Sequence, residues 1–509
     1  MKTLNTNARR WILPLSAFAI SAFVLLFCSK SSPLYPMNDW VDVHCFLTLG
    51  RGLLNGMIPY VDLYEQKGPV LYFIYAIVAL FSQKSMLGQY LLEVITFGLL
   101  LYYSAKIAAI YLGQRSFYLY PIMGALAACI ASSYSFCHGG SVEQMCLFMF
   151  TYGLYSVLKG IHEGKALSFR CALTNGIFAG MVFWIKYTMT GFYIGLAIFV
   201  LIWYLIYIHY TKKLLATISA FLLGVAAVST VVLLFFLIAG GLKELFTCYF
   251  YNNIFLYTDE NDNSNLLSIY YKIRYSMFHN LVYPSLIGLG FGWLLFRGKE
   301  RIMDAFAFII TFICLGGFSL IGKAYAYYGL VLSIFAVFGL IAGAWLCREL
   351  KVSELIRKLS FGTKLIPALI SVFLIVLCTM QGYKHSSNTY LMRYEREEMP
   401  QYQFAQIINQ TEDPTILNFG FLDGGFYYAA DVLPTCPFFC SFNVNAPGMW
   451  QTQYDYIRYA KVDYVITRDY PLEDYKIHTD RYELVSTATM TFEGYDFTYY
   501  LYRITGEAQ

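Results

Sequence analysis

Long apolar stretches recur along this chain and constrain its fold more than any other feature of the sequence. Each has about the length of an α-helix that crosses the roughly 30 Å hydrocarbon core of a bilayer. The first runs from Trp11 to Cys28. The ten further stretches that we interpret as spans cover residues 88–111, 117–137, 143–159, 170–186, 187–211, 214–241, 276–296, 302–322, 325–347 and 364–382. The sequence therefore predicts an α-helical polytopic membrane protein with about eleven transmembrane helices.

The composition supports this class of protein. Hydrophobic residues make up 58% of the chain and charged residues 13%, against about 45–50% and about 25% in soluble domains. The formal net charge is only +4 and the basic residues cluster in short connections, so no nucleic-acid partner is indicated. The first span lacks small residues at a plausible cleavage point, and Phe27 before Cys28 disfavours a lipoprotein signal. We therefore expect a retained helix with a cytoplasmic N-terminus.

The apolar segment 69–84 is at the short limit for crossing a bilayer, and the positive charges of the connections decide its interpretation. Cytoplasmic connections carry an excess of Lys and Arg. If residues 69–84 do not cross, nearly all basic clusters of the spanning region fall on the cytoplasmic side: Arg115; Lys159, Lys165 and Arg170; Lys212 and Lys213; Arg297, Lys299 and Arg301; Arg348, Lys351, Arg357, Lys358 and Lys364. We therefore expect a juxtamembrane helix in the first outer loop, and a C-terminus outside the plasma (inner) membrane of a bacterium.

The domain organisation follows from this topology. Residues 1–382 are expected to form the transmembrane domain, with outer loops at 29–87, 138–143 and 242–275. From about Tyr383 the sequence becomes polar, and it contains one helical stretch at 398–410 and β-like runs at 415–420, 463–468 and 496–504. This pattern predicts a small extracytoplasmic α/β domain over 383–509. Cys436 and Cys440 would face an oxidising compartment there, but their spacing alone does not establish a disulfide.

Charged side chains in the first outer loop are the first candidates for chemistry. Asp39 follows the first span, with Asp42 one helical turn further on, and a carboxylate at the membrane boundary can act as a general base. Equally, Asp39 could simply cap a helix that starts near Trp40. Lys67 lies at the start of the juxtamembrane helix, where a cation can hold a lipid phosphate. Its alternative role is ordinary snorkelling to headgroups.

A second outer turn adds a third acidic residue. Gly139 and Gly140 permit a tight turn between two spans, and Glu143 then begins the next helix. A glutamate at a helix N-terminus is also favoured by the helix dipole and needs no function. Lys186 and Lys323 are expected at outer helix ends, where each alone would more commonly be an anchor. Several carboxylates and cations on one face of a membrane bundle nevertheless favour a functional site.

The first loop resembles that of a known superfamily. The segment NDW…GRGLLNGMIPYVDLYEQKGPVLYFIYA is similar to the first extracytoplasmic loop of the GT-C glycosyltransferases, in the group of protein O-mannosyltransferases and lipid A aminoarabinose transferases. The group's loop pattern matches Asp39, then Gly56, Pro59, Tyr60, Asp62, Lys67 and Pro69, then Glu143. Residues 322–337 loosely resemble a late segment of the group. The chain departs from the group's pattern at Trp40, at Gln66 and at the pair Tyr327-Tyr328, where His-Tyr is usual, and these departures bear mainly on the acceptor.

This resemblance implies transfer of a sugar from a polyprenyl-phosphate donor to a glycan, lipid or protein acceptor on the outer face. Asp39 and Glu143 would be the catalytic residues, with Asp39 as the general base. The residues implied to bind substrate are Asp42, Asp62, Glu65, Lys67, Lys186, Lys323 and Tyr327. No cofactor is implied with certainty. Carboxylates near a phosphate are compatible with a divalent cation, but no cluster has compelling metal-ligand spacing.

Two other classes of function remain open. A transporter or flippase for lipid-linked saccharides would also need many spans, although transporters usually carry inverted repeats and charges near the bilayer midplane. The second alternative class is a noncatalytic scaffold in envelope assembly. The sequence does not identify the sugar, the acceptor or the oligomeric state.

Overall fold

The computed structural model describes residues 6–114, 116–136, 139–257, 282–320, 325–352, 365–444, 446–477, 480–492 and 495–506. The chain forms two compact units, each built from separated segments. The first combines residues 1–29, 90–230 and 261–389, and the second combines residues 30–89, 231–260 and 390–509.

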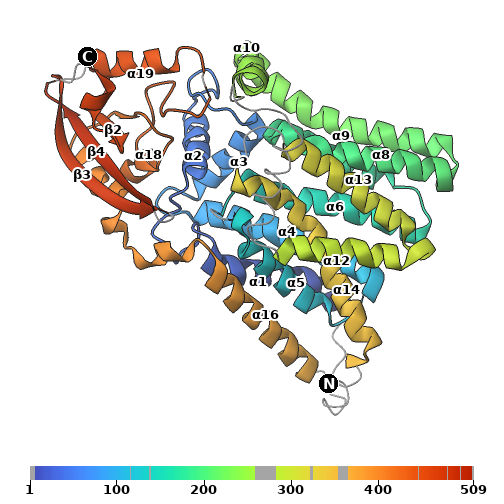
Figure 1. Cartoon of the computed structure of the whole chain (residues 1–509). Helices are drawn as coiled ribbons and strands as arrows, with labels where there is room; N and C mark the ends of the chain where they lie inside the picture. The colour runs from blue at the N-terminus through green and yellow to red at the C-terminus, as the bar shows by residue number, and fades with distance from the viewer. Residues whose placement is uncertain are drawn as a thin grey trace. The chain divides into compact units, whose positions relative to one another are not determined.

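The first unit is a bundle of helices. Its elements are α1 (Thr6–Cys28), α4 (Leu87–Leu112), α5 (Leu119–Ala131), η1 (Tyr134–Phe136), α6 (Val142–Glu163), α7 (Phe169–Ile185), η2 (Tyr187–Thr190), α8 (Gly191–Trp203), η3 (Tyr204–Ile208), most of α9 (Thr211–Ile238), α12 (Val282–Phe296), η5 (Gly298–Glu300), α13 (Ile302–Ser319), η6 (Ala326–Phe335), α14 (Ala336–Glu349) and α16 (Leu365–His385) (Figure 1). Each of the eleven expected spans contains one of these helices.

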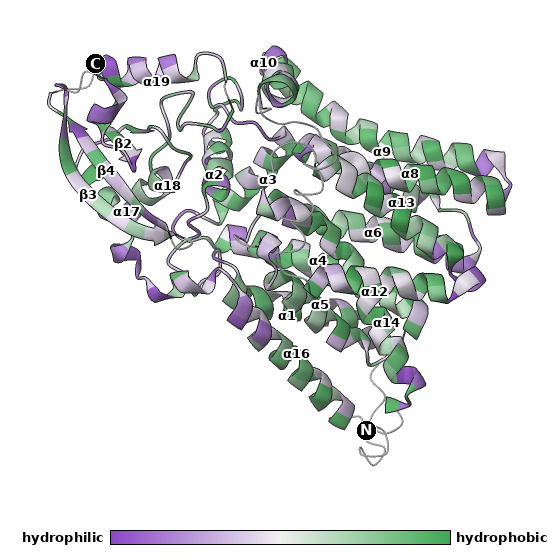
Figure 2. Ribbon diagram, in the orientation of Figure 1, coloured by the Kyte–Doolittle hydropathy of each residue, from purple (hydrophilic) through white to green (hydrophobic). Residues whose placement is uncertain are grey.

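Length and hydropathy support membrane crossing. Among the described residues, seven helical segments are long and apolar enough to span: Arg10–Cys28, Leu87–Leu112, Tyr187–Ile208, Thr211–Ile238, Ile302–Ser319, Ala326–Glu349 and Ile366–His385. Figure 2 shows hydrophobic residues along most of α8, α9 and α13. The predicted class, a polytopic helical membrane protein, is confirmed, while its orientation stays a prediction. The helices α5, α7 and α12 are apolar but shorter.

Small residues allow close helix packing in this unit. Gly176 on α7 faces the backbone of α9 at Phe221, and Gly224 on α9 faces the backbone of α7 at Leu173, so that a Cβ atom at either glycine would collide with main-chain atoms. Close approach at small residues is the usual device of helix association in bilayers, where the hydrophobic effect gives little help.

The second unit begins with residues 30–89, which contain most of the expected first outer loop. It contains α2 (Val41–Leu54) and α3 (Pro69–Leu80), which pack on each other, followed much later in the chain by α10 (Leu242–Phe246) and the π-helical η4 (Thr247–Leu256). Helix α3 has 12 residues, a length of about 18 Å at 1.5 Å per residue. That is well short of the hydrocarbon core, as expected for a juxtamembrane helix.

The C-terminal part of this unit is a small α/β domain. Its elements are η7 (Thr389–Arg393), η8 (Arg396–Glu398), α17 (Pro400–Ile408), β1 (Ile416–Asn418), α18 (Phe426–Ala430), α19 (Met449–Arg458), β2 (Tyr464–Arg468), η9 (Leu472–Tyr475), β3 (Tyr482–Phe492) and β4 (Tyr495–Ile504). The sheet has the order β1-β2-β4-β3, in which β1 and β2 are parallel and the other pairs antiparallel. A core that includes Leu417, Phe419, Val465 and Tyr502 is buried in it.

The predicted helix and three predicted strands of this domain are confirmed as α17, β1, β2 and β4. Strand β3, YELVSTATMTF, was missed because Glu483, Ser486 and three threonines interrupt its apolar residues and weaken the apolar signal. It is placed by pairing with β4, from Tyr482 opposite Ile504 to Phe492 opposite Tyr495.

Candidate active site

Asp39 lies in a buried ion pair in the second unit. Its Oδ1 accepts a hydrogen bond from Lys30 Nζ at 2.7 Å, and its Oδ2 accepts one from the Tyr390 hydroxyl at 2.7 Å. The lysine is fully buried and the aspartate is 6% exposed. Both carboxylate oxygens are therefore engaged, one by a residue 9 positions before Asp39 and one by a residue 351 positions after it.

The capping role left open for Asp39 is wrong. Helix α2 begins at Val41, its N-cap residue is Trp40, and no side chain caps it. Asn38 instead holds the backbone just before the helix, because its Oδ1 accepts a hydrogen bond from Trp40 N at 3.0 Å. Asp42 lies in the first turn of α2, where a negative charge interacts favourably with the positive end of the helix dipole. Asp39 is thus left to pair with Lys30.

One face of α2 is fixed to the C-terminal domain by two polar contacts, one buried and one exposed to solvent. Thr48 Oγ1 donates to Asp423 Oδ2 at 2.8 Å, and Arg51 pairs with Asp431 at 2.5 Å. His44 is 1% exposed, and its Nε2 lies 2.5 Å from Asn38 O. Burial lowers the pKa of His44, opposed mainly by the negative charge of Asp423. Burial also raises the pKa of Asp423, and the charge of His44 opposes this shift because it favours the ionised carboxylate.

The loop before α3 is held by its own acidic residues. Asp62 Oδ2 accepts a hydrogen bond from Ile58 N at 2.7 Å, and Glu65 Oε2 accepts one from Lys67 N at 2.8 Å. The Tyr60 hydroxyl donates to Lys67 O at 2.5 Å, although Tyr60 has a φ of 71°, an uncommon conformation for a residue with a side chain. Asp62 and Glu65 therefore fix the backbone of the segment that leads to Lys67. Lys67 Nζ lies 6.0 Å from the centroid of the Phe46 ring.

A second buried ion pair lies in the first unit. Gly139 and Gly140 adopt φ angles of 69° and 77° in the predicted tight turn, and Glu143 follows in the first turn of α6. Glu143 is 2% exposed, and its Oε1 accepts a hydrogen bond from Lys186 Nζ at 2.5 Å. Lys186 is the C-cap residue of α7. Glu143 therefore interacts with Lys186 as well as with the dipole of its own helix.

Tyrosines complete this second cluster. Lys186 Nζ lies 3.6 Å from the centroid of the Tyr328 ring and 5.8 Å from that of Tyr327. Cation–π contacts of this kind stabilise a lysine that is largely removed from water. Three predicted residues from distant segments, Glu143, Lys186 and Tyr327, are thus brought together. The predicted Lys323 lies outside the described residues.

Three functional candidates were missed in the sequence. Lys30 and Tyr390 contact Asp39, as described above. Glu93 on α4 is 2% exposed, and its Oε2 accepts hydrogen bonds from Ser29 Oγ at 2.7 Å and Gln144 Nε2 at 3.3 Å. The available signal was a lysine directly after the first span and a glutamate inside a span, where a charge normally needs a partner. Nothing in the sequence marked Tyr390 among its 46 tyrosines.

The described residues contain neither a disulfide between Cys436 and Cys440 nor a candidate metal site. Cys436 and Cys440 are both free thiols. Within the described ranges, no group of three or more His, Cys, Asp or Glu side chains is arranged to hold a metal ion.

Comparisons with known proteins define the fold. No family model and no curated protein sequence matches the chain. Among solved structures, it is similar to ArnT from Cupriavidus metallidurans bound to undecaprenyl phosphate, with a TM-score of 0.58, 12% identity and coverage of 98% of both chains. The apo state of that ArnT gives a TM-score of 0.62 at 13% identity, covering 97% of this chain and 98% of the other.

Arabinofuranosyltransferase AftD from Mycobacteria is also similar, with a TM-score of 0.54 and 12% identity over 99% of this chain and 40% of its own. The archaeal oligosaccharyltransferase AglB from Archaeoglobus fulgidus, in complex with an inhibitory peptide and a dolichol-phosphate, gives a TM-score of 0.50 at 11% identity, over 91% of this chain and 70% of its own. The fold is that of the GT-C membrane glycosyltransferases, as the resemblance of the first loop predicts.

Proposed function

We propose that this protein is a membrane glycosyltransferase that moves a sugar from a polyprenyl-phosphate donor to an acceptor on the extracytoplasmic face. The similarity to ArnT extends over nearly the whole of both chains, and one of the ArnT structures holds undecaprenyl phosphate. The AglB structure holds a dolichol-phosphate. A polyprenyl-phosphate carrier is therefore the donor class that the comparisons support.

The observation that carries the proposal is the pair of buried carboxylates, Asp39 and Glu143, each in contact with a lysine. Buried ion pairs contribute little net stability compared with apolar packing. In membrane proteins such groups commonly mark functional sites. Here they coincide with the acidic positions of the GT-C pattern in the first and second outer loops.

The proposed reaction is a single displacement at the anomeric carbon. The acceptor oxygen or nitrogen forms a bond to that carbon as the bond from the carbon to the phosphate oxygen breaks, with inversion. The acceptor proton passes to Asp39, and the electron pair of the broken bond stays on the polyprenyl phosphate. Since both oxygens of Asp39 are occupied, the acceptor must replace the Tyr390 hydroxyl at Oδ2 for this transfer to occur.

Lys67 is proposed to neutralise the departing phosphate. Its main chain is fixed by Glu65 and Tyr60, so only the side chain needs to adjust to the donor. Preorganised positive charge in a water-poor site is among the largest contributions to such reactions.

The remaining predicted residues have supporting roles in this proposal. Asp62 and Glu65 act through the loop that they fold. Glu143 and Lys186, with Tyr327, are proposed to orient substrate, and Lys323 and Asp42 to contribute charge.

A structure of the full chain with undecaprenyl phosphate tests the donor assignment. The proposal predicts density for the phosphate within hydrogen-bond distance of Lys67 Nζ, and loss of that density in Lys67→Ala. The exposed Lys84, in the same loop, supplies the matched control Lys84→Ala, which should keep the ligand. A phosphate bound elsewhere in both variants would overturn the role of Lys67.

The orientation is tested independently. A reporter that is active only outside the cytoplasm, fused after Tyr383, should be active if the C-terminal domain is extracytoplasmic. Activity of a reporter that works only in the cytoplasm would contradict the proposed topology, and with it the assignment of the outer loops.

A further inference from the structure

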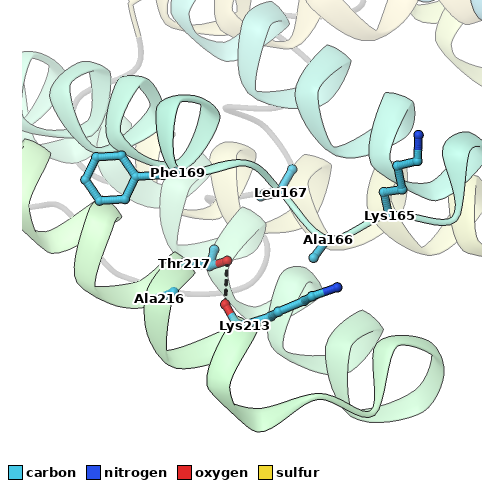
Figure 3. A pocket seen from close by; sticks show the side chains of 7 residues that line it. All are labelled: Lys165, Ala166, Leu167, Phe169, Lys213, Ala216 and Thr217. Atoms are coloured by element: carbon cyan, nitrogen blue, oxygen red, sulfur yellow. Dashed lines mark hydrogen bonds between the residues drawn. The ribbon is translucent and has the colours of Figure 1, made fainter.

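A cavity of about 340 Å³ lies in the first unit. It is lined by Lys165, Ala166, Leu167, Phe169, Lys213, Ala216 and Thr217 (Figure 3). These residues come from the connection between α6 and α7, from the first residue of α7 and from the first turns of α9. The volume lies in the range of small-molecule sites, roughly 300–1,000 Å³.

The cavity is at the other end of the bundle from Glu143 and Lys186. Glu143 begins α6 and Lys186 ends α7, whereas the cavity lies where α6 ends and α7 begins. The 22 residues of α6 give a separation of about 33 Å along the helix. The cavity is therefore at the opposite membrane surface and does not depend on the proposed sugar transfer.

A chain of hydrogen bonds closes one wall of the cavity. Leu167 N donates to the Tyr204 hydroxyl at 2.8 Å, that hydroxyl lies 2.9 Å from Thr217 Oγ1, and Thr217 Oγ1 donates to Lys213 O at 2.9 Å. Tyr204 opens the π-helical turn η3, a distortion that occurs often at functional sites. Because these polar groups already satisfy one another, a ligand would be recognised mainly through the charged lining.

That charge is positive and uncompensated. Lys165 and Lys213 are both exposed, and across the described residues no carboxylate forms an ion pair with either of them. Lys213 Nζ lies 5.4 Å from the centroid of the Tyr210 ring. In Figure 3 the two lysines are at one end of the lining and Phe169 is at the other. Compact ammonium groups suit a phosphate, which they bind as point charges.

An apolar surface continues from the cavity along α9. Phe169 is 57% exposed, and Leu215, Ile218 and Leu222, spaced three and four residues apart on one side of α9, are 58%, 42% and 57% exposed. In the most hydrophobic 18-residue stretch of α9, only 17% of the residues are buried by the rest of the protein. Such a helix side is the surface that acyl chains contact in a bilayer.

We propose that this cavity binds the phosphate headgroup of an anionic glycerophospholipid between Lys165 and Lys213, with its acyl chains along the exposed side of α9. Positive charge at one end and apolar surface at the other match an amphipathic anion, and they disfavour a zwitterionic lipid, whose own cation would meet the lysines. Selection by charge alone further implies little discrimination among anionic headgroups.

Native mass spectrometry of the detergent-purified full chain tests this proposal. Phosphatidylglycerol and phosphatidylcholine with identical acyl chains are titrated, and bound lipids are counted. The test variant is Lys165→Gln/Lys213→Gln. The matched control, Lys299→Gln/Lys351→Gln, removes the same charge from exposed lysines in other connections, outside the cavity.

The wild-type chain should retain phosphatidylglycerol in preference to phosphatidylcholine. Each lysine near an anionic lipid contributes on the order of fivefold in affinity, so the test variant should bind phosphatidylglycerol about 10- to 30-fold more weakly, and the control within about threefold of wild type. Equal losses in both variants would show diffuse interfacial charge and overturn the site, as would an unchanged test variant. Displacement of the lipid by millimolar inorganic phosphate would also contradict it, because it would indicate a site for free phosphate.

Discussion

Replacing Asp39 by asparagine should affect both stability and transfer, for separable reasons. Asparagine is nearly isosteric and keeps one oxygen that can accept from Lys30, while its amide nitrogen stands where Oδ2 accepts from Tyr390. It also removes the negative charge beside a lysine that is 0% exposed. Leaving one partner of a buried pair uncompensated costs about 3–5 kcal/mol. Losing a positioned general base lowers the rate by about 10²- to 10⁴-fold. Asp39→Asn alone therefore cannot distinguish a base from a structural counter-ion.

The double variant Lys30→Met/Asp39→Asn separates the two roles. Removing both charges should recover most of the lost stability, measured as the thermal unfolding midpoint in detergent, while transfer stays about 10²- to 10⁴-fold below wild type. Asp474→Asn, an exposed carboxylate of the same unit, serves as the control and should change neither property. If the double variant regained near-normal transfer together with its stability, Asp39 would be only the counter-ion of Lys30.

Three further outcomes are expected. Lys67→Ala should weaken donor binding as well as turnover, because its charge meets the phosphate in the ground state and in the transition state, whereas Lys84→Ala should change neither; a normal donor Kd in Lys67→Ala would contradict this. Glu143→Gln and Lys186→Gln should each reduce transfer, and the double variant should be little worse than the more damaging single one, since the two side chains form one ion pair; additive losses would show independent roles. The thermal midpoint should fall as the pH drops below about 6.5, the ordinary pKa of histidine, because burial lowers the pKa of His44 and only the unfolded chain then gains the proton; His44→Gln should flatten this part of the profile, and an identical profile in that variant would refute the assignment.

The helical part of the fold was predictable because apolar runs of membrane length carry a strong signal, and all eleven expected spans contain helices. The C-terminal domain was predictable wherever apolar residues mark a buried strand, as in β2, whose first four residues are buried. Strand β3 was not predictable, since it forms a strand through its pairing with β4 rather than through a pattern in its own sequence. Similarly, the division of the chain into two units joins residues 30–89 with 390–509, and local patterns carry no information on such long-range association.

The site was predictable only in part. Glu143 and Lys186 were singled out separately as charges at helix ends, and the contact between them depends on how α6 and α7 pack. Asp39 was identified through the loop pattern, but its partners were not: Tyr390 is separated from it by 351 residues. Asp62 and Glu65 were expected to meet substrate, and their hydrogen bonds to Ile58 and Lys67 main-chain groups reveal a role in folding the loop that a pattern of residue types cannot distinguish from binding.

The most direct test of the central claim is a transfer assay with three distinguishable results. The purified chain, in liposomes that contain radiolabelled polyprenyl-phosphate sugars, is incubated with candidate glycan, lipid and protein acceptors. We predict that the label moves from the polyprenyl carrier to an acceptor with wild type, and that Lys30→Met/Asp39→Asn slows this movement about 10²- to 10⁴-fold. Label that crosses the bilayer while still attached to its carrier would instead show a flippase, and label that neither moves nor transfers with any donor and acceptor pair would favour a scaffold; either result would contradict the proposed glycosyltransferase.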